Sequence, residues 1–344
     1  MGWTPRRVFA CLVVAAIVAG APEVGAAAPL RDPQRIERAV GYIASHQKPN
    51  GSVPAFSPIG STADAVVSFV AAGSGRPQVR RALGFLRRRV KANAVDTIGL
   101  QAKVTIALVA SGRSPRDFGG LNLVKALRRS ILPSGRFGDA PVFDDALATL
   151  ALAGVGIAVP QPALDWLLAA QCPDGGWQYD EPAGDTEDEH CRSTTDPDTD
   201  FFASDTNTTS YVVQALEAGS AVDPAFAADP FEFFASIRDA GFGGWGYSWG
   251  VETTDANSTA LVIQAYAAVG LPVPDGAMKA LRALQFPRCG AWAFTWTDQD
   301  GGPVRDGPNV GATIGAVLGL LRLPLPVTGA THGPAADTPA CSSA

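Results

Sequence analysis

The sequence predicts an all-α protein built from repeated helix pairs, and three observations lead to this prediction. Apolar residues recur at helical spacing along most of the chain, and no segment alternates convincingly as a strand does. The turn from Gln171 to Trp177 and the helix start from Asp205 to Leu216 recur in weaker copies. A chain of 344 residues exceeds the usual size of a single core, unless repeats form a ring or a solenoid.

The first three predicted pairs each join an outer helix to a more apolar inner helix. They span 32–47 with 63–72, 78–90 with 96–111, and 121–131 with 146–153. Pro33 suits the first turn of a helix, where no backbone N–H is needed. Polar residues begin the three inner helices: Ser61 and Thr62, Asp96 and Thr97, and Asp144 and Asp145. Such residues typically cap helix N-termini.

The last three predicted pairs span 162–171 with 206–218, 230–238 with 257–269, and 276–285 with 310–321. The inner helices are apolar on most sides, which indicates burial on most sides. The turns from outer to inner helix vary in length, and the longest contains an acidic insert at 178–204. Insertions on one face of a repeat protein usually mark its binding face.

The two ends of the chain are predicted to lie outside the repeats, which occupy 29–323. Residues 1–28 have the features of a signal peptide: Arg6 and Arg7, an apolar run from Val8 to Gly20, and small residues up to Ala28. We therefore expect export, to the medium or to the cell envelope. The tail 324–344 is rich in Pro, Ala and Gly and is expected to be disordered. Leu325 to Gly329 resembles a sortase signal without the apolar and basic residues that should follow.

Four cysteines follow the predicted signal peptide, and an even number in an exported chain predicts two disulfides. The short separation favours Cys172 with Cys191 as a local pair. Cys289 and Cys341 would then pair and hold the tail.

The motif Gln171-x-x-x-Gly175-x-Trp177 resembles the glutamine-tryptophan repeat of squalene and other terpenoid cyclases. The segments 242–245 and 285–292 resemble degenerate copies. The six pairs resemble the α/α toroid of terpenoid cyclases, protein prenyltransferase β subunits and cobalamin carriers, over about residues 33–322. The resemblance implies an (α/α)6 toroid, a six-hairpin barrel, in which Trp177 and Trp245 are structural.

In such a ring the N-termini of the inner helices meet at the mouth of a central cavity. The polar residues there, with nearby aromatic residues, are candidate ligand-binding residues: Thr62, Asp96, Thr97, Asp205, Thr206, Thr208, Thr209, Tyr211, Trp249, Asp255, Asn257, Thr259, Trp292 and Asn309. Each polar residue taken singly is better explained as a helix cap. As a set, they predict a polar rim above an apolar wall, which suits a bulky small molecule.

Catalysis is the alternative interpretation, and it depends on Asp144. The resemblance to squalene-type cyclases implies an Asp-x-Asp-Asp motif at an inner-helix start, where this chain has Val142-Phe143-Asp144-Asp145. Asp144 holds the position of the proton donor and Asp145 follows it, but the first aspartate of the motif is absent. Trp249 and Trp292 would then stabilise a carbocation. The sequence is thus compatible with both a binding protein and an enzyme.

No metal or cofactor is predicted with any specificity. The zinc site of protein prenyltransferases needs Asp, Cys and His, and no Cys and His pair has that spacing here. Asp196, Asp198 and Asp200 resemble the opening of a calcium loop, but Phe201 stands at the position of the turn glycine. A solvated acidic loop explains them better.

The leading functional hypothesis is an exported, non-catalytic protein that binds a cobalamin-like or isoprenoid molecule in its cavity. A partner protein or transporter would complete its role. An isoprenoid cyclase or prenyltransferase and a wall-associated scaffold are the alternatives. The net charge of −6 and the lack of basic stretches argue against nucleic acid and anionic membranes. No apolar run of about 18 residues follows the signal peptide, so no membrane span is expected.

Overall fold

The computed structural model describes residues 31–180, 191, 203–220, 225–248, 251–299 and 302–341. They belong to one compact unit, Arg31 to Ala344. The predicted signal peptide, Trp249 and most of the acidic insert, including Asp196, Asp198 and Asp200, lie outside the described residues. None of the described helices is both long enough and apolar enough to cross a membrane.

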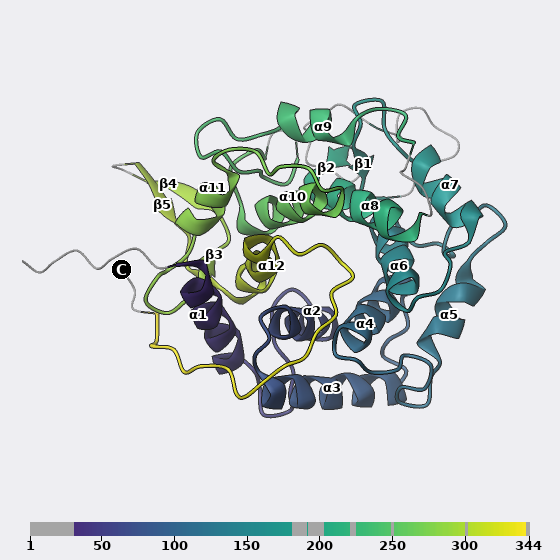
Figure 1. Ribbon diagram of the computed structural model, residues 1–344, viewed down its shortest axis with the longest axis horizontal. Helices are drawn as coiled ribbons and strands as arrows, with labels where there is room; N and C mark the ends of the chain where they lie inside the picture. Colours follow the sequence, from purple (N-terminus) through teal and green to yellow (C-terminus); the bar gives the residue numbers. More distant parts are fainter. Residues whose placement is uncertain are drawn as a thin grey trace, which may run out of the picture. The chain divides into compact units, whose positions relative to one another are not determined.

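The described residues form the six predicted helix pairs, arranged as two concentric rings (Figure 1). The outer helices are α1 (Asp32–Ser45), α3 (Arg76–Lys91), α5 (Leu123–Ser130), α7 (Gln161–Ala169), α9 (Pro230–Ser236) and α11 (Ala277–Ala283). The inner helices are α2 (Pro58–Ala71), α4 (Ile98–Ala110), α6 (Val142–Gly154), α8 (Thr206–Gly219), α10 (Ala256–Ala268) and α12 (Val310–Leu321). The predicted all-α toroid is confirmed.

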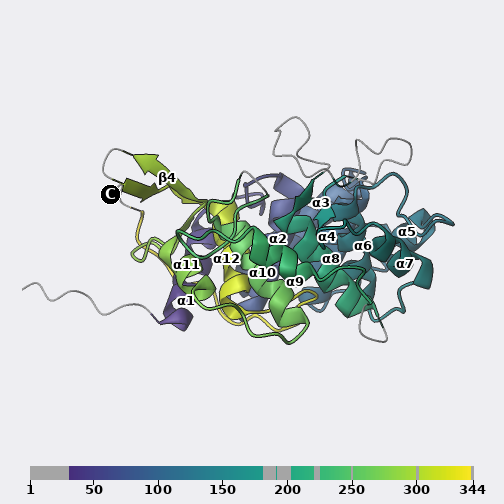
Figure 2. The same ribbon diagram turned by 90° about the horizontal axis from the view of Figure 1, so that it is seen from above.

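The inner ring closes because each inner helix packs against the next and α12 packs against α2. Most residues of these helices are buried, which explains their apolar composition on nearly every side. In Figure 2, which views the ring from its edge, neighbouring helices stand side by side. The core therefore lies between the two rings, and the inner ring surrounds a central space.

Polar side chains cap most of the inner helices, as the sequence predicts. Thr97, Asp205, Asp255 and Asn309 each accept a backbone N–H from the first turn of their helix. The predictions for α2 and α6 were wrong by about one turn. Ser57 caps α2 and Pro58 begins it, while α6 begins at Val142 after Pro141, so Asp144 and Asp145 lie inside its first turn. Ser61 and Thr62 therefore lie inside α2, where the sequence placed its cap.

Three short antiparallel strand pairs occur among the described residues, although the sequence shows no convincing strand. β1 (Trp177–Gln178) pairs with β2 (Ser204–Asp205), and β3 (Trp292–Ala293) pairs with β6 (Pro308–Asn309). β4 (Trp296–Gln299) and β5 (Gly302–Arg305) form a hairpin that projects outward from the ring (Figures 1 and 2). The first two pairs have only two residues per strand, which is too short to produce a readable alternation.

The glutamine-tryptophan turn connects neighbouring repeats through hydrogen bonds and packing. Gln171 donates its amide to the carbonyls of Gly175 and Ala228, at 2.9 and 2.8 Å. The indole of Trp177 is fully buried and donates to the Leu167 carbonyl at 2.7 Å. Gly175 has a φ of +90°, and a Cβ there would lie 2.6 Å from the backbone of the next repeat. This motif is therefore structural.

The C-terminal tail is ordered up to Cys341, which corrects the expectation of disorder. It runs across the C-terminal ends of the inner helices (Figure 1). Leu325 N–H donates to Gln214 at 2.9 Å, and Gly329 N–H donates to the Ala110 carbonyl at 3.3 Å. Val327 is buried. The sortase-like segment from Leu325 to Gly329 is thus packed against the ring. Composition predicts disorder here, but the helix ends supply apolar surface and unpaired carbonyls.

Both expected disulfides are present. The Cα atoms of Cys172 and Cys191 lie 5.3 Å apart, and those of Cys289 and Cys341 lie 5.0 Å apart. The second bond joins the end of the tail to the turn after α11. The tail is therefore held by a covalent bond as well as by packing.

Candidate functional site

A cavity of about 470 Å³ occupies the centre of the inner ring. All six inner helices contribute to its wall, and so do several turns that lead into them. The residues that line it are Phe56, Ser61, Asp64, Val67, Lys103, Ile106, Phe143, Leu147, Tyr179, Asn207, Tyr211, Tyr247, Asp255, Asn257, Leu261, Gln264, Phe294, Gly311, Ile314, Gly315, Leu318 and Leu325. Its volume lies in the range of small-molecule sites, about 300–1,000 Å³.

The polarity of the wall changes with depth. Near the N-terminal ends of the inner helices the lining includes Ser61, Asn207 and Asn257. One to two turns deeper, Val67, Ile106, Leu147 and Leu318 replace them, with Gln264 among them. Leu325 of the tail closes the deep end. The cavity therefore has a mouth of polar and aromatic residues, Phe56, Phe143 and Phe294 among them, and a mainly aliphatic floor.

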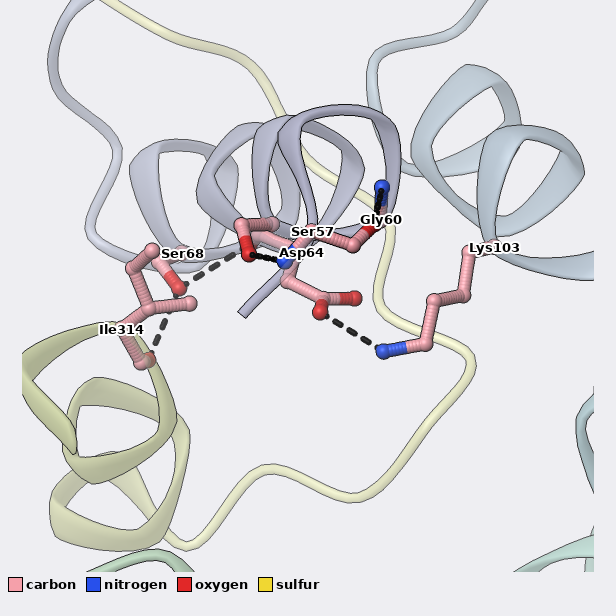
Figure 3. Close-up of polar contacts among 7 residues, drawn as sticks. Ser57, Gly60, Asp64, Ser68, Lys103 and Ile314 are labelled. Atoms are coloured by element: carbon pink, nitrogen blue, oxygen red, sulfur yellow. Dashed lines mark hydrogen bonds and ion pairs between the residues drawn. The ribbon is translucent and has the colours of Figure 1, made fainter. Parts of the chain in front are cut away.

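An ion pair between Lys103 and Asp64 lies in the middle of the wall. Lys103 Nζ on α4 lies 2.7 Å from Asp64 Oδ2 on α2 (Figure 3). The second oxygen of Asp64 has no hydrogen-bond partner among the described residues. Burial lowers the pKa of Lys103, but Asp64, Tyr211 and Asp144 together raise it above its ordinary value. Lys103 is therefore charged inside the cavity.

Hydrogen bonds hold α2, the helix that carries Asp64, both before and after this residue in the sequence. Ser57 accepts the Gly60 N–H at 3.0 Å and so caps α2 two turns before Asp64. Ser68, one turn after Asp64, donates to the Ile314 carbonyl of α12 at 2.9 Å (Figure 3). These contacts set the position from which Asp64 reaches Lys103.

Asp144 lies in a side pocket of about 240 Å³, next to the main cavity. The two spaces share Phe56, Ser61, Asp64 and Lys103, but Asp144 lines only the side pocket. Burial raises the pKa of Asp144, and Lys103 and the Gly99 N–H partly oppose this rise. A Cβ at Gly99 would lie 2.2 Å from Asp144, so a side chain at this position would displace the carboxylate.

Asp145 is fully buried and does not line either space. One of its oxygens accepts the Phe137 N–H at 3.2 Å. Burial raises the pKa of Asp145 from 3.8 to about 8. Asp145 stands where other repeats have Thr62, Thr209 and Thr259. Each of these threonines accepts a backbone N–H from the turn that leads into its helix. Asp145 therefore has the contact of a structural residue.

The predicted threonines of the inner helices hold the turns rather than face the cavity. Thr209 Oγ1 accepts the Trp177 N–H at 2.9 Å, and Thr259 Oγ1 accepts the Trp245 N–H at 3.0 Å. Thr62 does the same for Val53 at 2.9 Å. The indole of Trp292 is buried and donates to the Leu281 carbonyl. None of these side chains lines the cavity.

The other predicted ligand residues divide between the cavity and the helix ends. Tyr211, Asp255 and Asn257 line the main cavity, and Thr97 lines the side pocket. Asp205 and Asn309 cap helices, Thr206 donates to the Gly246 carbonyl at 2.8 Å, Thr208 is buried and Asp96 is exposed. Burial raises the pKa of Asp255 to about 6, and the Ser258 N–H and hydroxyl partly oppose this.

Two groups of cavity residues were missed at the sequence level, although signals for both were present. Lys103 is the one charged residue in a largely apolar inner helix, and such a residue needs a buried partner. Tyr179, Tyr247 and Phe294 each stand two residues after a structural tryptophan, and each lines the cavity. This spacing recurs in three successive repeats.

A Thr209→Val variant separates a structural role from a ligand-binding role. Valine has nearly the same shape but leaves the Trp177 N–H without its partner, at a cost of about 1–3 kcal/mol in the free energy of unfolding. Thr209→Ser keeps the hydroxyl and serves as the control. Urea denaturation measures both. Unchanged stability in the valine variant would contradict the structural role.

Among the described residues, no group of three or more His, Cys, Asp or Glu side chains could hold a metal ion. No family model and no curated protein matches the sequence.

Solved structures show where else the fold occurs. The unsaturated glucuronyl hydrolase of Bacillus sp. GL1 aligns with a TM-score of 0.58 at 14% identity, over 87% of this chain and 98% of its own. An unsaturated glucuronyl hydrolase specific for heparin aligns with a TM-score of 0.56 at 13% identity, over 85% of this chain and 96% of its own. Haptocorrin in complex with Cbi aligns with a TM-score of 0.49 at 11% identity, over 87% of this chain and 69% of its own. The two hydrolases show that this chain shares the α/α-toroid fold.

Proposed function

We propose that this protein is an exported, non-catalytic carrier that holds a bulky, mainly apolar small molecule in its central cavity. The cavity of about 470 Å³, with its mouth of polar and aromatic residues and its mainly aliphatic floor, is the observation that supports this function. A molecule with one polar end would enter with its apolar part first and leave the polar part near the mouth and the ion pair of Lys103 and Asp64. The two disulfides fit an oxidising compartment outside the cytosol.

An isoprenoid fits the deep wall better than a cobalamin-like molecule. The floor offers aliphatic side chains such as Val67, Ile106 and Leu318, with Gln264 as a polar group. A corrinoid carries many amides, and burying them against this wall would leave their hydrogen bonds unmade. A hydrocarbon body has no such cost. A partner protein or transporter would receive the molecule at the mouth.

The enzymatic alternative has less support because of where Asp144 lies. A cyclase acid must reach the substrate, and Asp144 lines the side pocket instead of the main cavity. Incubation with squalene-like substrates decides between the two. Turnover by the wild-type protein that is lost in Asp144→Asn would replace the carrier proposal with the enzyme.

The carrier function is tested by filling the cavity. Leu261 lines the wall and is only partly buried, so Leu261→Trp should place an indole in the cavity with little disturbance of the core. We expect this variant to weaken binding of the neutral fluorescent probe N-phenyl-1-naphthylamine by about tenfold or more. Val304→Trp, on the exposed hairpin, is the matched control. Equal binding by both variants would contradict a cavity site.

A further inference from the structure

The charges that line the cavity are mainly negative. Asp64 and Asp255 line the main cavity, and Asp144 lines the side pocket. Among the described lining residues, Lys103 carries the one positive charge. Its ammonium already contacts Asp64 at 2.7 Å and is close to Asp144 as well. An anion brought to Lys103 would therefore meet two carboxylates at short range, and their repulsion offsets the attraction of the lysine.

Asp64 can accept a further hydrogen bond from a ligand. Only one of its oxygens is directed at Lys103 Nζ (Figure 3). The carboxylate is more exposed than the lysine, with 38% of the Asp64 side chain accessible. Because Asp64 lines the cavity, this accessible surface faces the space in which a ligand would lie.

Aromatic rings lie on the same side of the cavity as these charges. The ring centroids of Phe143 and Tyr211 are 5.1 Å apart, and those of Phe143 and Tyr179 are 5.4 Å apart. Tyr211 is close to both Lys103 and Asp64, and all three rings line the cavity. Aromatic faces attract organic cations, most strongly where water is excluded.

We infer that the polar group of the ligand is a cation, such as an amine, held between the Asp64 carboxylate and the rings of Phe143, Tyr179 and Tyr211. This inference rests on the proposed function and adds the class of ligand. A bulky apolar amine would place its hydrocarbon part against the aliphatic floor and its charge beside Asp64. A carboxylate with the same hydrocarbon part would meet Asp64 and Asp144 beside Lys103 instead.

Three probes with one hydrocarbon cage test the inference: 1-aminoadamantane, 1-hydroxyadamantane and adamantane-1-carboxylate. Each competes with N-phenyl-1-naphthylamine for the wild-type protein, and the inhibition constants are compared. We expect the amine to bind about tenfold more tightly than the carboxylate, with the alcohol between them. Equal or tighter binding of the carboxylate would overturn the inference.

Two substitutions with opposite effects assign the preference to these residues. Asp64→Asn should reduce the amine-to-carboxylate ratio, and Lys103→Met should increase it, each by about fivefold or more. Asp117→Asn, an exposed site in the loop after α4, should leave the ratio unchanged. Binding of the fluorescent probe reports that each variant is folded. A ratio that neither Asp64→Asn nor Lys103→Met moves would overturn the inference.

The same assay distinguishes the two proposals. Should the fluorescent probe bind the wild-type protein while no adamantane competes, the cation inference fails and the carrier function stands. Should the fluorescent probe itself fail to bind, the carrier function fails and the inference with it.

Discussion

An Asp145→Asn variant is expected to gain stability over the wild-type protein as the pH rises. Asp145 is fully buried, and burial raises its pKa from 3.8 to about 8. The native protein therefore keeps a proton that the unfolded chain releases between these two values. Stability from this group is complete below pH 3.8 and is lost as the pH rises through about 8. Asparagine does not titrate, so the free energy of unfolding of the variant does not fall for this reason as the pH rises.

The expected size of the effect follows from the width of the pH interval. Each pH unit in that interval changes the free energy of unfolding by about 1.4 kcal/mol, so the gain between pH 5 and pH 8 is at most about 4 kcal/mol. At pH 5 the variant should be the less stable protein. One oxygen of Asp145 has no hydrogen-bond partner among the described residues, and the new amide would be unpaired there.

The readout is the difference in free energy of unfolding between variant and wild type, from urea titrations at several pH values. This difference removes the contribution of Asp255, which titrates in both proteins. Asp145→Thr supplies the residue used at the equivalent position in other repeats and should show the same dependence. A difference that stays constant from pH 5 to pH 9 would contradict a protonated Asp145.

Replacing Cys289 and Cys341 together by serine should destabilise the protein by about 4 kcal/mol. The disulfide closes a loop with a sequence separation of 52, and the chain-entropy estimate for a loop of that length is about 4 kcal/mol. The same change frees the end of the tail, whose Leu325 closes the floor of the cavity. We therefore expect the cavity to become open at its deep end.

Two measurements check this expectation. Urea denaturation gives the loss of stability, and the exchange rates of N-phenyl-1-naphthylamine show whether the floor has opened. The double variant of Cys172 and Cys191, whose separation is 19, is the control. It should lose about 3 kcal/mol and leave the exchange rates unchanged. If both double variants release the probe equally fast, the tail does not act as the floor.

Local sequence was sufficient to predict the helix pairs and the glutamine-tryptophan turns between them. Helical spacing, capping residues and glycine turns act over a few residues, so Asp205 as a cap and Trp177 as a structural residue could be read directly. The disulfide pairing also followed from separation along the chain. The tail was predicted less well, because its order depends on helix ends that composition does not reveal.

Only the tertiary structure decided which polar residues face the cavity. Successive residues of an inner helix point in directions about 100° apart, so Thr208 and Thr209 are buried while Asn207 and Tyr211 line the wall. The pairing of Asp64 with Lys103 joins two helices and has no local signal beyond a lysine in an apolar stretch. The sequence by itself determined the six helix pairs and how they begin. Closure of the ring determined the site, because it brings side chains from all six inner helices to a single space.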